Sequence, residues 1–437
     1  MTNCNQNSYQ FSPLNRKKIT ASFNGGAIGS DGGLLLIREV DKQIGLTKKI
    51  SKIFSDHRHQ SYIEHSIEHL LKQRVYAIAA GYEDVNDHDF LRNDLCFQTA
   101  VGREVALASS ATLSRFENSA DRKVLVAISK ILVEHFIARH KTAPQELILD
   151  FDPTDNRIYG HQEKRHYHGY YQNYCYLPLH VFCGEHLLVS LLRPSDIDGA
   201  KYAGAILKLL VKRFREVWPK VKIVFRGDSG FARKRILYWC ENNDVEYIVG
   251  IGSNSRLQKL AEDVIKQAKN LYETTREKQR VFAEFYYKAE SWNCQRRIIA
   301  KAENNEKGEN TRFLITNKKD VSQIIYDNHY CPRGDMENNL KQLKLDLYSD
   351  RNSCHDFLAN HFRVLLSSIA YILLIELKSV HLKKTNLAKA YCGTVQLKLL
   401  KIGVMILKNT RNIKFLLASH CPYQNDFITA VQSLVPS

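Results

Sequence analysis

Several features that mark exported or membrane proteins are missing from this sequence of 437 residues. It has ten cysteines, but none form a C-x-x-C pair and their spacing fits no disulfide framework. The N-terminus MTNCNQNSYQ is polar and lacks the apolar core of a signal peptide. The longest uncharged apolar run, VLLSSIAYILLI (364–375), is too short for a membrane span. These absences predict a soluble cytoplasmic protein with reduced thiols and no membrane partner.

Acidic residues are scarce near the C-terminus, where basic residues are frequent. From Lys378 onward there are nine Lys and Arg residues against a single acid, Asp426. Over the whole chain 63 Lys and Arg face 46 Asp and Glu, which gives a formal net charge of +17. A scattered excess would indicate only a solvated surface, but clustered cations favour contacts with phosphate groups. The charge therefore points to nucleic acid as a partner.

The order of hydrophobic patterns predicts the fold class. The length allows two or three domains, and 44% hydrophobic residues indicate a globular protein. Residues 34–140 are predicted to be mainly helical, and after Pro144 short apolar strands begin. Three strands joined as a meander are followed by helix, strand, helix and strand. This order is that of the ribonuclease H-like fold, an α/β mixed sheet flanked by helices. The predicted segments are strands 146–152, 173–184 and 186–194, helix 203–217, strand 221–228, helix 233–243 and strand 245–252.

Changes of composition along the chain predict four regions. Residues 252–328 are polar and charged, contain three strand-like runs and interrupt the α/β pattern. The expected regions are a helical N-terminal DNA-binding region (1–140), a catalytic domain (141–251 and 329–378), a β-rich insertion (252–328) and a basic helical C-terminal region (379–437).

Two aspartates come at the ends of predicted strands that should be neighbours. Asp152 ends the strand of LILDFDPTD, and Asp228 ends the strand of VFRGDSGFA. Side by side they would repel, and a divalent cation would remove that repulsion. The alternative is that each aspartate caps the turn that follows it. Asp150 shares a strand face with Asp152, because side chains alternate along a strand, so it remains a rival for the same role.

A third carboxylate, Glu337, lies in a predicted helix that starts at Pro332. On an ideal helix Arg333, Glu337 and Lys344 fall within about 40° of one another. This face would offer one carboxylate for a metal ion and two cations for phosphate. An exposed ion-pair ladder of Arg333, Glu337 and Lys341 explains the same spacing equally well. His161, His166, His168 and Cys175 match no zinc-ligand spacing.

These motifs resemble those of a known enzyme family. The spacing Y-x2-R-x3-E-x6-K is the signature of transposases of the insertion-sequence-four superfamily, and here it is filled by Tyr330, Arg333, Glu337 and Lys344. Further blocks resemble the insertion-sequence-1380 family of DDE transposases over nearly the entire chain. They include FNGGAIGSDGG, RVYAIAAGYEDVNDHDFLRND, ASSATLSRFEN, LDFDPTD, YYQNYCYLPLHVF, FRGDSGFA, RGDMENNLKQLKLDL and ANHFRVLLSSIAY.

The resemblance implies a catalytic triad and its metal ions. Asp152, Asp228 and Glu337 would be the triad and would hold two Mg²⁺ or Mn²⁺ ions. Arg333 and Lys344 would contact DNA phosphates, and Tyr330 would position the strand. The sequence does not decide between Asp150 and Asp152 as the first carboxylate of the triad.

The resemblance also implies a reaction and its partners. A transposase of this family would bind the terminal inverted repeats of its element, cut the DNA there and join the freed 3′-OH to target DNA. We expect it to act as a homodimer on DNA in the bacterial cytoplasm, associated with the nucleoid. Two other classes keep the same fold: a transposase-derived regulator that binds DNA without turnover, and a plain metal-dependent nuclease.

A tryptophan in the insertion suggests how a second strand could be cut. Related transposases form a DNA hairpin held by a β-rich insertion, and this insertion contains Trp292 beside Arg296 and Arg297. We hypothesise that Trp292 stacks on a flipped base and that the two arginines contact the DNA. The alternative is that Trp292 packs in the insertion's own core.

Overall fold

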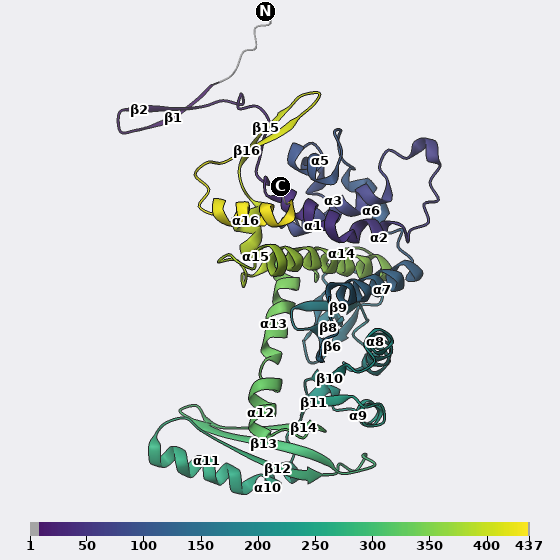
Figure 1. The fold of residues 1–437 in the computed structure, drawn as a ribbon, viewed down its shortest axis with the longest axis vertical. Helices are drawn as coiled ribbons and strands as arrows, with labels where there is room; N and C mark the ends of the chain where they lie inside the picture. The colour runs from purple at the N-terminus through teal and green to yellow at the C-terminus, as the bar shows by residue number, and fades with distance from the viewer. Residues whose placement is uncertain (1–7, 436–437) are drawn as a thin grey trace, which may run out of the picture. The chain divides into compact units, whose positions relative to one another are not determined.

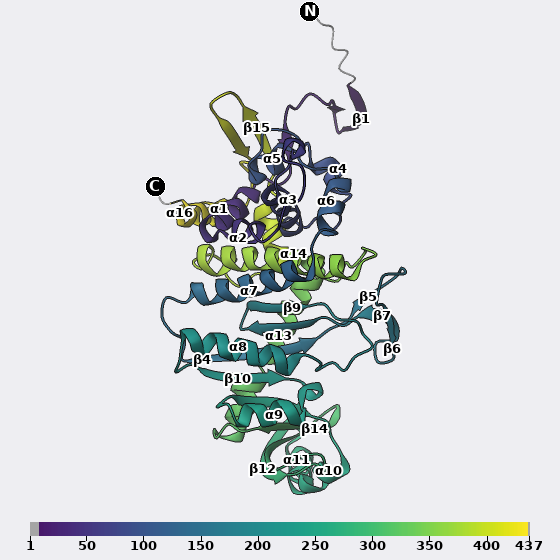
Figure 2. The same cartoon turned by 90° about the vertical axis from the view of Figure 1, so that its right-hand side faces the viewer.

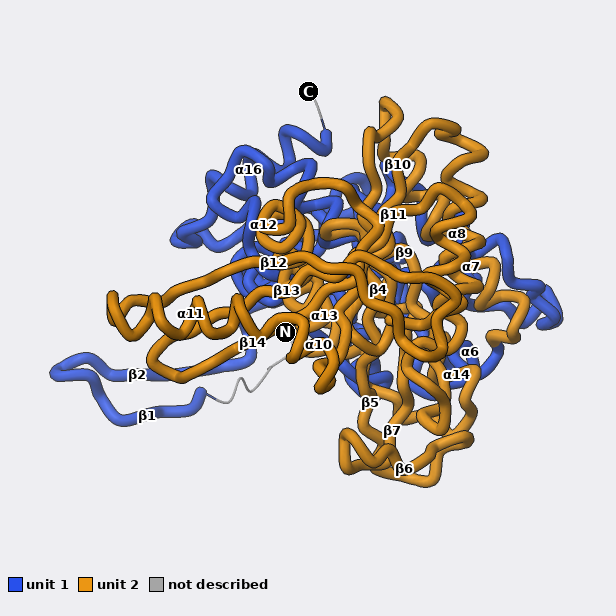
Figure 3. Tube along the Cα trace, turned by 90° about the horizontal axis from the view of Figure 1, so that it is seen from below, with its two compact units in different colours: residues 1–119, 369–437 blue, residues 120–368 orange. Residues whose placement is uncertain are grey.

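The computed structural model describes residues 8–435, and it divides into two compact units (Figure 3). Unit 1 holds residues 1–119 and 369–437, and unit 2 holds residues 120–368. These units differ from the four expected regions. Residues 1–119 of the expected N-terminal region share unit 1 with the C-terminal region. Residues 120–140 and the segment 252–328 belong to unit 2, with the strands that carry Asp152 and Asp228.

Unit 2 is built on one mixed sheet of eight strands (Figures 1 and 2). Its spatial order is β12-β13-β14-β11-β10-β4-β8-β9. The last five strands, read from β9 to β11, follow the order 3-2-1-4-5 that the ribonuclease H-like prediction requires, so this prediction is confirmed. The strands are β4 (Glu146–Pro153), β8 (Leu179–Cys183), β9 (His186–Leu191), β10 (Lys222–Gly227), β11 (Glu246–Ile251), β12 (Gln279–Tyr287), β13 (Arg296–Asn305) and β14 (Gly308–Thr316).

The register of the central strands places the two predicted aspartates next to each other. β10 runs parallel to β4, and the ladder pairs Lys222 with Glu146 and Gly227 with Phe151. Asp152 and Asp228 directly follow Phe151 and Gly227, the last pair of this β4–β10 ladder. Parallel strands bring their carboxyl ends to the same edge of a sheet, so both side chains leave the sheet at one edge.

Both faces of this sheet are covered, because its strands carry apolar residues on both sides. On one face Leu149 and Phe151 pack in a core with helices α7 (Arg122–Arg139), α8 (Ala203–Val217) and α9 (Lys234–Glu241). On the other face Ile148, Val224 and Ile248 pack against Ile325 and Tyr326. The alternation of Ile148 with its neighbours along β4 is the period of two that a strand imposes.

Ile325 and Tyr326 belong to a helical segment that runs past the second face of the sheet (Figure 1). The predicted helix starts at Pro332, but the structure begins it ten residues earlier. Two π-helical turns flank its regular middle part; such turns occur frequently at functional sites. The parts are α12 (Ser322–Ile324), the π-helical η3 (Ile325–Tyr330), α13 (Arg333–Lys341) and the π-helical η4 (Gln342–Asp346).

The segment 252–328 is β-rich as predicted, but its strands do not form a sheet of their own. β14 pairs antiparallel with β11, matching Ile248 to Thr316, and β13 and β12 follow it outward. The insertion therefore extends the central sheet, because the free edge of β11 offers unpaired backbone groups to a new strand. It also contains two helices that the sequence analysis did not predict, α10 (Ser255–Leu260) and α11 (Glu262–Thr275).

The predicted strand 173–184 is broken in the structure. Its first half is β7 (Asn173–Tyr176), which leaves the main sheet and joins β5 (Asn156–Arg157) and β6 (His166–His168) in the small sheet β5-β7-β6. Its second half is β8. The break falls at Leu177 and Pro178, because proline has no N–H to donate to a ladder.

Unit 1 is mainly helical, which confirms the prediction for the N-terminal region. The C-terminal region was predicted to be helical, but it also contains the hairpin β15–β16. Val404 and Ile406 are buried whereas Met405 and Leu407 are exposed, so this stretch has the period of a strand. The helices of unit 1 are α1 (Leu34–Ile44), α2 (Leu46–Ser51), α3 (Ile67–Ala79), α4 (His88–Leu91), α5 (Leu95–Val101), α6 (Ser110–Glu117), α15 (Cys392–Val395) and α16 (Gln424–Leu434), and its strands are β1 (Tyr9–Leu14), β2 (Lys17–Ala21), β3 (Ile28–Gly29), β15 (Val404–Lys408) and β16 (Ile413–Leu417).

One helix is longer than the apolar run suggested. The run 364–375 lies within α14 (Phe357–Glu376), which continues to His381 and is long and apolar enough to cross a membrane by length and composition alone. However, 94% of its most apolar window is buried inside the protein, as in a core helix.

Candidate active site

The first two carboxylates stand at the edge of the sheet where β4 and β10 end. Asp152 is the penultimate residue of β4, and Asp228 directly follows β10. Oδ1 of Asp228 accepts a hydrogen bond of 2.8 Å from the N–H of Gly230, so Asp228 also caps the turn after it. One oxygen of Asp228 therefore caps the following turn, as the alternative interpretation of this aspartate expected.

Arg333 connects the first carboxylate with the third. Its Nη2 donates to Oδ1 of Asp152 at 2.6 Å, and its Nη1 donates to Oε1 of Glu337 at 3.0 Å. The side chains of Arg333 and Asp152 are each 14% exposed, whereas that of Glu337 is 54% exposed. Arg333, which the sequence placed on one helix face with Glu337, thus contacts Asp152, 181 positions earlier in the chain.

The pKa of Asp152 shows that the three carboxylates share one electrostatic environment. Burial raises the pKa of Asp152 to about 6, against the opposing effect of the Arg333 guanidinium. The charges of Asp228 and Glu337 contribute to this rise of the pKa, because a nearby negative charge disfavours a second one. A cation at this edge would relieve both effects.

Asp150, the rival of Asp152, is used in a different way. Its side chain is 2% exposed, and both of its oxygens accept hydrogen bonds from Arg226, one of them at 2.6 Å. Arg226 also donates to the backbone carbonyl of His329. Asp150 is therefore held in a closed, buried ion pair, two residues before a carboxylate at the strand's end.

The sequence analysis missed a glycine beneath Tyr330. A Cβ at Gly250 would lie 3.1 Å from the hydroxyl of Tyr330 and 3.0 Å from the backbone nitrogen of Ser229. Both distances are tighter than ordinary van der Waals contact, so Gly250 lets Tyr330 approach the turn that follows Asp228. A glycine inside the predicted strand 245–252 was the available signal, since such a glycine marks a close approach of other atoms.

Lys344 reaches the loop that follows Asp152. Its Nζ donates to the carbonyl oxygen of Asp155 at 2.6 Å and to the Thr154 hydroxyl at 3.3 Å. Lys344 belongs to the π-helical turn η4. The structure thus places Tyr330, Arg333, Glu337 and Lys344 along one helical segment beside the ends of β4 and β10.

Trp292 and its neighbouring arginines are engaged in contacts within unit 2, and their role in DNA binding stays a prediction. Trp292 is 6% exposed and packs in the core of unit 2, with its ring edge-on to Tyr287 and under the Arg296 guanidinium. Arg296 is 3% exposed and bound to both carboxylate oxygens of Glu241 at 2.6 and 2.8 Å. The alternative for Trp292, a core residue of the insertion, fits these contacts.

Arg297 is also occupied by its own fold. It is ion-paired with Glu284, and its Nη1 donates to the carbonyl oxygen of Lys318 at 2.6 Å. A side chain held in this way would have to give up contacts before it could bind a phosphate.

The basic C-terminal cluster is partly committed to unit 1. Nζ of Lys401 lies 3.2 Å from Oδ1 of the buried Asp31, and Nζ of Lys408 lies 3.2 Å from Oε2 of Glu104. These two lysines therefore stabilise the fold, and they are weaker candidates for phosphate contacts than the sequence indicated.

The residue types at the strand ends suit a divalent metal ion, but their present spacing does not enclose one. Carboxylate oxygens are the ligands that Mg²⁺ and Mn²⁺ prefer, and three carboxylates here influence one another's charge. Among residues 8–435, no three His, Cys, Asp or Glu side chains are close enough together to hold a metal ion. Arg333 explains this at the strand ends, because its guanidinium supplies the positive charge between Asp152 and Glu337.

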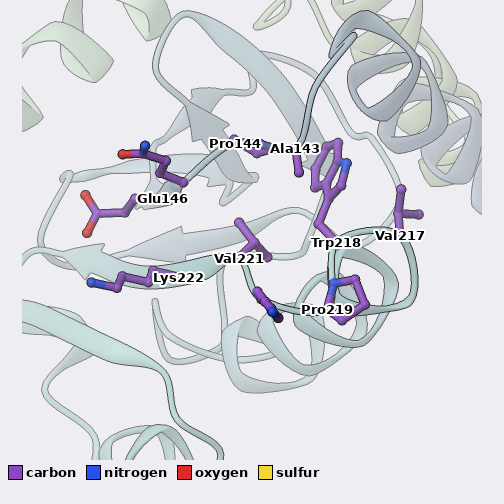
Figure 4. A pocket seen from close by; sticks show the side chains of 10 residues that line it. Ala143, Pro144, Glu146, Val217, Trp218, Pro219, Val221 and Lys222 are labelled. Atoms are coloured by element: carbon purple, nitrogen blue, oxygen red, sulfur yellow. The ribbon is translucent and has the colours of Figure 1, made fainter.

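A hollow on the surface of unit 2 lies elsewhere. A cavity of about 810 Å³ is lined by Glu146, Trp218 and Lys222 (Figure 4). Glu146 and Lys222 begin β4 and β10, so this cavity lies at the opposite edge of the sheet, about 20 Å along the strands from the carboxylates. We therefore place the candidate site by its charged groups, not by the cavity.

A ribonuclease H-like sheet with acidic residues at the ends of its two central strands is the arrangement of the DDE class. A family model described as "Transposase DDE domain group 1" matches residues 11–437, nearly the whole chain. The protein belongs to this family of DDE transposases. No curated protein matches the chain. Among solved structures the chain is similar to piggyBac transposase in a cryo-EM synaptic complex with hairpin DNA, with 12% identity, a TM-score of 0.44 and coverage of 85% of this chain and 80% of that chain.

Proposed function

We propose that this protein is the transposase of a bacterial insertion sequence of the 1380 family. It binds the terminal inverted repeats of its element, cuts the DNA there and joins the 3′-OH to target DNA. The observation that supports this most is the joining of Asp152 and Glu337 through Arg333, beside Asp228 at the same edge of the sheet.

In this proposal Asp152, Asp228 and Glu337 hold two Mg²⁺ or Mn²⁺ ions. When bound, such ions activate the attacking oxygen and stabilise the leaving one in phosphoryl transfer. Asp152 is preferred over Asp150, because both oxygens of Asp150 already accept hydrogen bonds from Arg226.

The basic and aromatic residues would position the DNA. Arg333 has a planar group with several donors that matches a phosphate as well as a carboxylate. We propose that it exchanges Asp152 and Glu337 for a DNA phosphate when metal ions neutralise these carboxylates. Lys344 would bind a neighbouring phosphate from the loop after Asp152, and Tyr330 would orient the strand from above Gly250.

The partners and the compartment follow from the same proposal. The net charge of +17 supports binding to DNA over long stretches of backbone. We propose a homodimer in the DNA complex, because an element has two ends that must be joined. The protein would act in the bacterial cytoplasm at the nucleoid, without a membrane partner.

One assay separates this function from its rivals. The protein is incubated with Mg²⁺, a labelled duplex from the DNA that borders its own gene, and a plasmid target. Joined product supports a transposase, cut but unjoined DNA indicates a nuclease, and shifted but uncut DNA indicates a regulator. Glu337→Gln is the control, since a nuclease contaminant would cut equally well in its presence.

A further inference from the structure

The segment that follows Asp152 exposes an unusual number of aromatic rings. Residues 159–174 contain five tyrosines among sixteen residues. Tyr170 is 84% exposed, Tyr159 80%, Tyr167 57% and Tyr174 47%. We call these four residues the tyrosine platform. They lie on or beside the small sheet β5-β7-β6, and their exposure means that packing within unit 2 does not explain them.

Arginine side chains lie against two of these rings. The guanidinium carbon of Arg157 is 5.1 Å from the centre of the Tyr159 ring, and that of Arg165 is 4.8 Å from the centre of the Tyr174 ring. Tyr174 also meets Tyr167 edge to face at 5.6 Å, directly across the β6–β7 ladder. The platform therefore combines flat apolar faces with positive charge.

The platform begins at the candidate active site. Tyr170 meets Tyr171 edge to face at 5.0 Å. Burial, followed by the charges of Asp155 and Asp152, raises the pKa of Tyr171 to about 12, so Tyr171 lies within electrostatic reach of the first carboxylate. Lys344 fixes the intervening loop through the carbonyl oxygen of Asp155.

We propose that the tyrosine platform binds unpaired bases of the DNA end next to the phosphate that is cut, with Tyr170 as the main stacking ring and Arg157 as a phosphate contact. This inference rests on the proposed function. Aromatic rings combined with cations are the arrangement that binds single strands, because every base has a flat face and every nucleotide a phosphate.

Charge favours DNA over a protein partner at this surface. Residues 156–176 carry Arg157, Lys164 and Arg165 against one acid, Glu163. Glu163 lies 3.3 Å from Lys164 and receives the backbone N–H of Phe357, so it is already engaged. The cations of this stretch therefore outnumber its one acid, and the nearby Asp196 lies 3.5 Å from His166.

The test measures single-strand binding without any cleavage. A 20-nucleotide strand carrying 2-aminopurine, and the duplex of the same sequence, are titrated with the full-length protein and its variants. Tyr170→Ala should weaken single-strand binding about 5- to 150-fold, the loss of one stacked base, and should reduce quenching of 2-aminopurine. Tyr170→Phe should bind like the unaltered protein, because the ring is retained.

A matched control and a salt titration complete the test. Tyr238 is 51% exposed and lies on α9, which carries none of the predicted DNA-binding residues, so Tyr238→Ala should bind normally. Arg157→Ala should lower the slope of log K against log salt by about 0.7, the value for one phosphate of a single strand.

Three outcomes would overturn the inference. The first is equal binding by Tyr170→Ala and Tyr238→Ala. The second is an equal loss with Tyr170→Phe, which would assign the contact to the hydroxyl. The third is unchanged binding with an altered oligomeric state in sedimentation, which would make the platform a protein contact. Failure of the proposed function would look different. In that case neither the unaltered protein nor any variant would cut or join DNA in Mg²⁺.

Discussion

Two Asp–Arg pairs lie two residues apart on strand β4, and they differ in almost every physical respect. Asp150 and Arg226 are 2% and 6% exposed, and both carboxylate oxygens are bound. Asp152 and Arg333 are each 14% exposed, share one hydrogen bond of 2.6 Å, and Arg333 divides its donors between two carboxylates. The first pair is closed and suits a structural role. The second is open to an added ion or phosphate and suits chemistry.

The aromatic residues show the same contrast. Trp292 lies under the guanidinium of Arg296, which is itself bound to Glu241, and the ring is 6% exposed. Tyr170 is 84% exposed in the segment that follows Asp152. An aromatic residue near arginines therefore indicates a nucleic-acid contact only when its ring face remains accessible. The following predictions test this distinction between closed and open arrangements.

The largest effect should come from the open carboxylates. Asp152→Asn, Asp228→Asn and Glu337→Gln should each reduce cleavage by about 10³-fold or more, because several kcal/mol of metal-based stabilisation are lost. DNA binding should change little. Cleavage of a labelled element end and a gel-shift titration measure the two effects. Normal cleavage by Asp152→Asn would refute the choice of Asp152 as the first carboxylate.

Breaking the closed pair should reduce stability instead. Arg226→Met leaves the charge of Asp150 buried without a partner and should cost about 3–5 kcal/mol of unfolding free energy. Replacing both residues, as in Asp150→Leu with Arg226→Met, should recover most of that loss. Urea denaturation measures both variants. If the double variant were folded but inactive while the Asp152 variant cut DNA, Asp150 would be the catalytic residue.

Trp292→Ala should also act through stability. It removes a large buried ring, which costs about 3–5 kcal/mol in a packed core. Cutting and joining per folded molecule should fall together or stay unchanged, and Trp292→Phe should regain part of the stability. Thermal unfolding and the joining assay are the measurements. A normal melting temperature with a specific defect in the second strand cut would restore the hairpin hypothesis.

The smallest effect is expected for a conservative change in the open pair. Arg333→Lys keeps the charge but loses the fork that reaches two acceptors at once. The rate of cleavage should fall about 10- to 150-fold, which corresponds to one lost charge-assisted hydrogen bond of about 1.5–3 kcal/mol. Lys341→Arg, on the same helix, is the matched control and should cut normally. An unchanged rate for Arg333→Lys would show that position 333 contributes charge alone.

Local patterns predicted the central sheet well. The strands that carry Asp152 and Asp228 were expected at 146–152 and 221–228, and they occur at Glu146–Pro153 and Lys222–Gly227. Short apolar runs and the amphipathic helix between them depend on neighbours in sequence, so periodicity reports them directly. The extension of the sheet by β12–β14 depends on which edge strand accepts a partner far along the chain, and no local pattern contains that choice.

The sequence by itself determined which residues were candidates for the site, because the spacing Y-x2-R-x3-E-x6-K and the two strand-end aspartates are properties of the linear chain. Only the tertiary structure decided what surrounds each candidate. It gave Asp150 a buried partner in Arg226 and buried Trp292 in a core. It also left Tyr170 exposed in the segment that follows Asp152. Burial and pairing arise from residues far apart in the sequence, 181 positions for Asp152 and Arg333, so they appear only when the chain has folded.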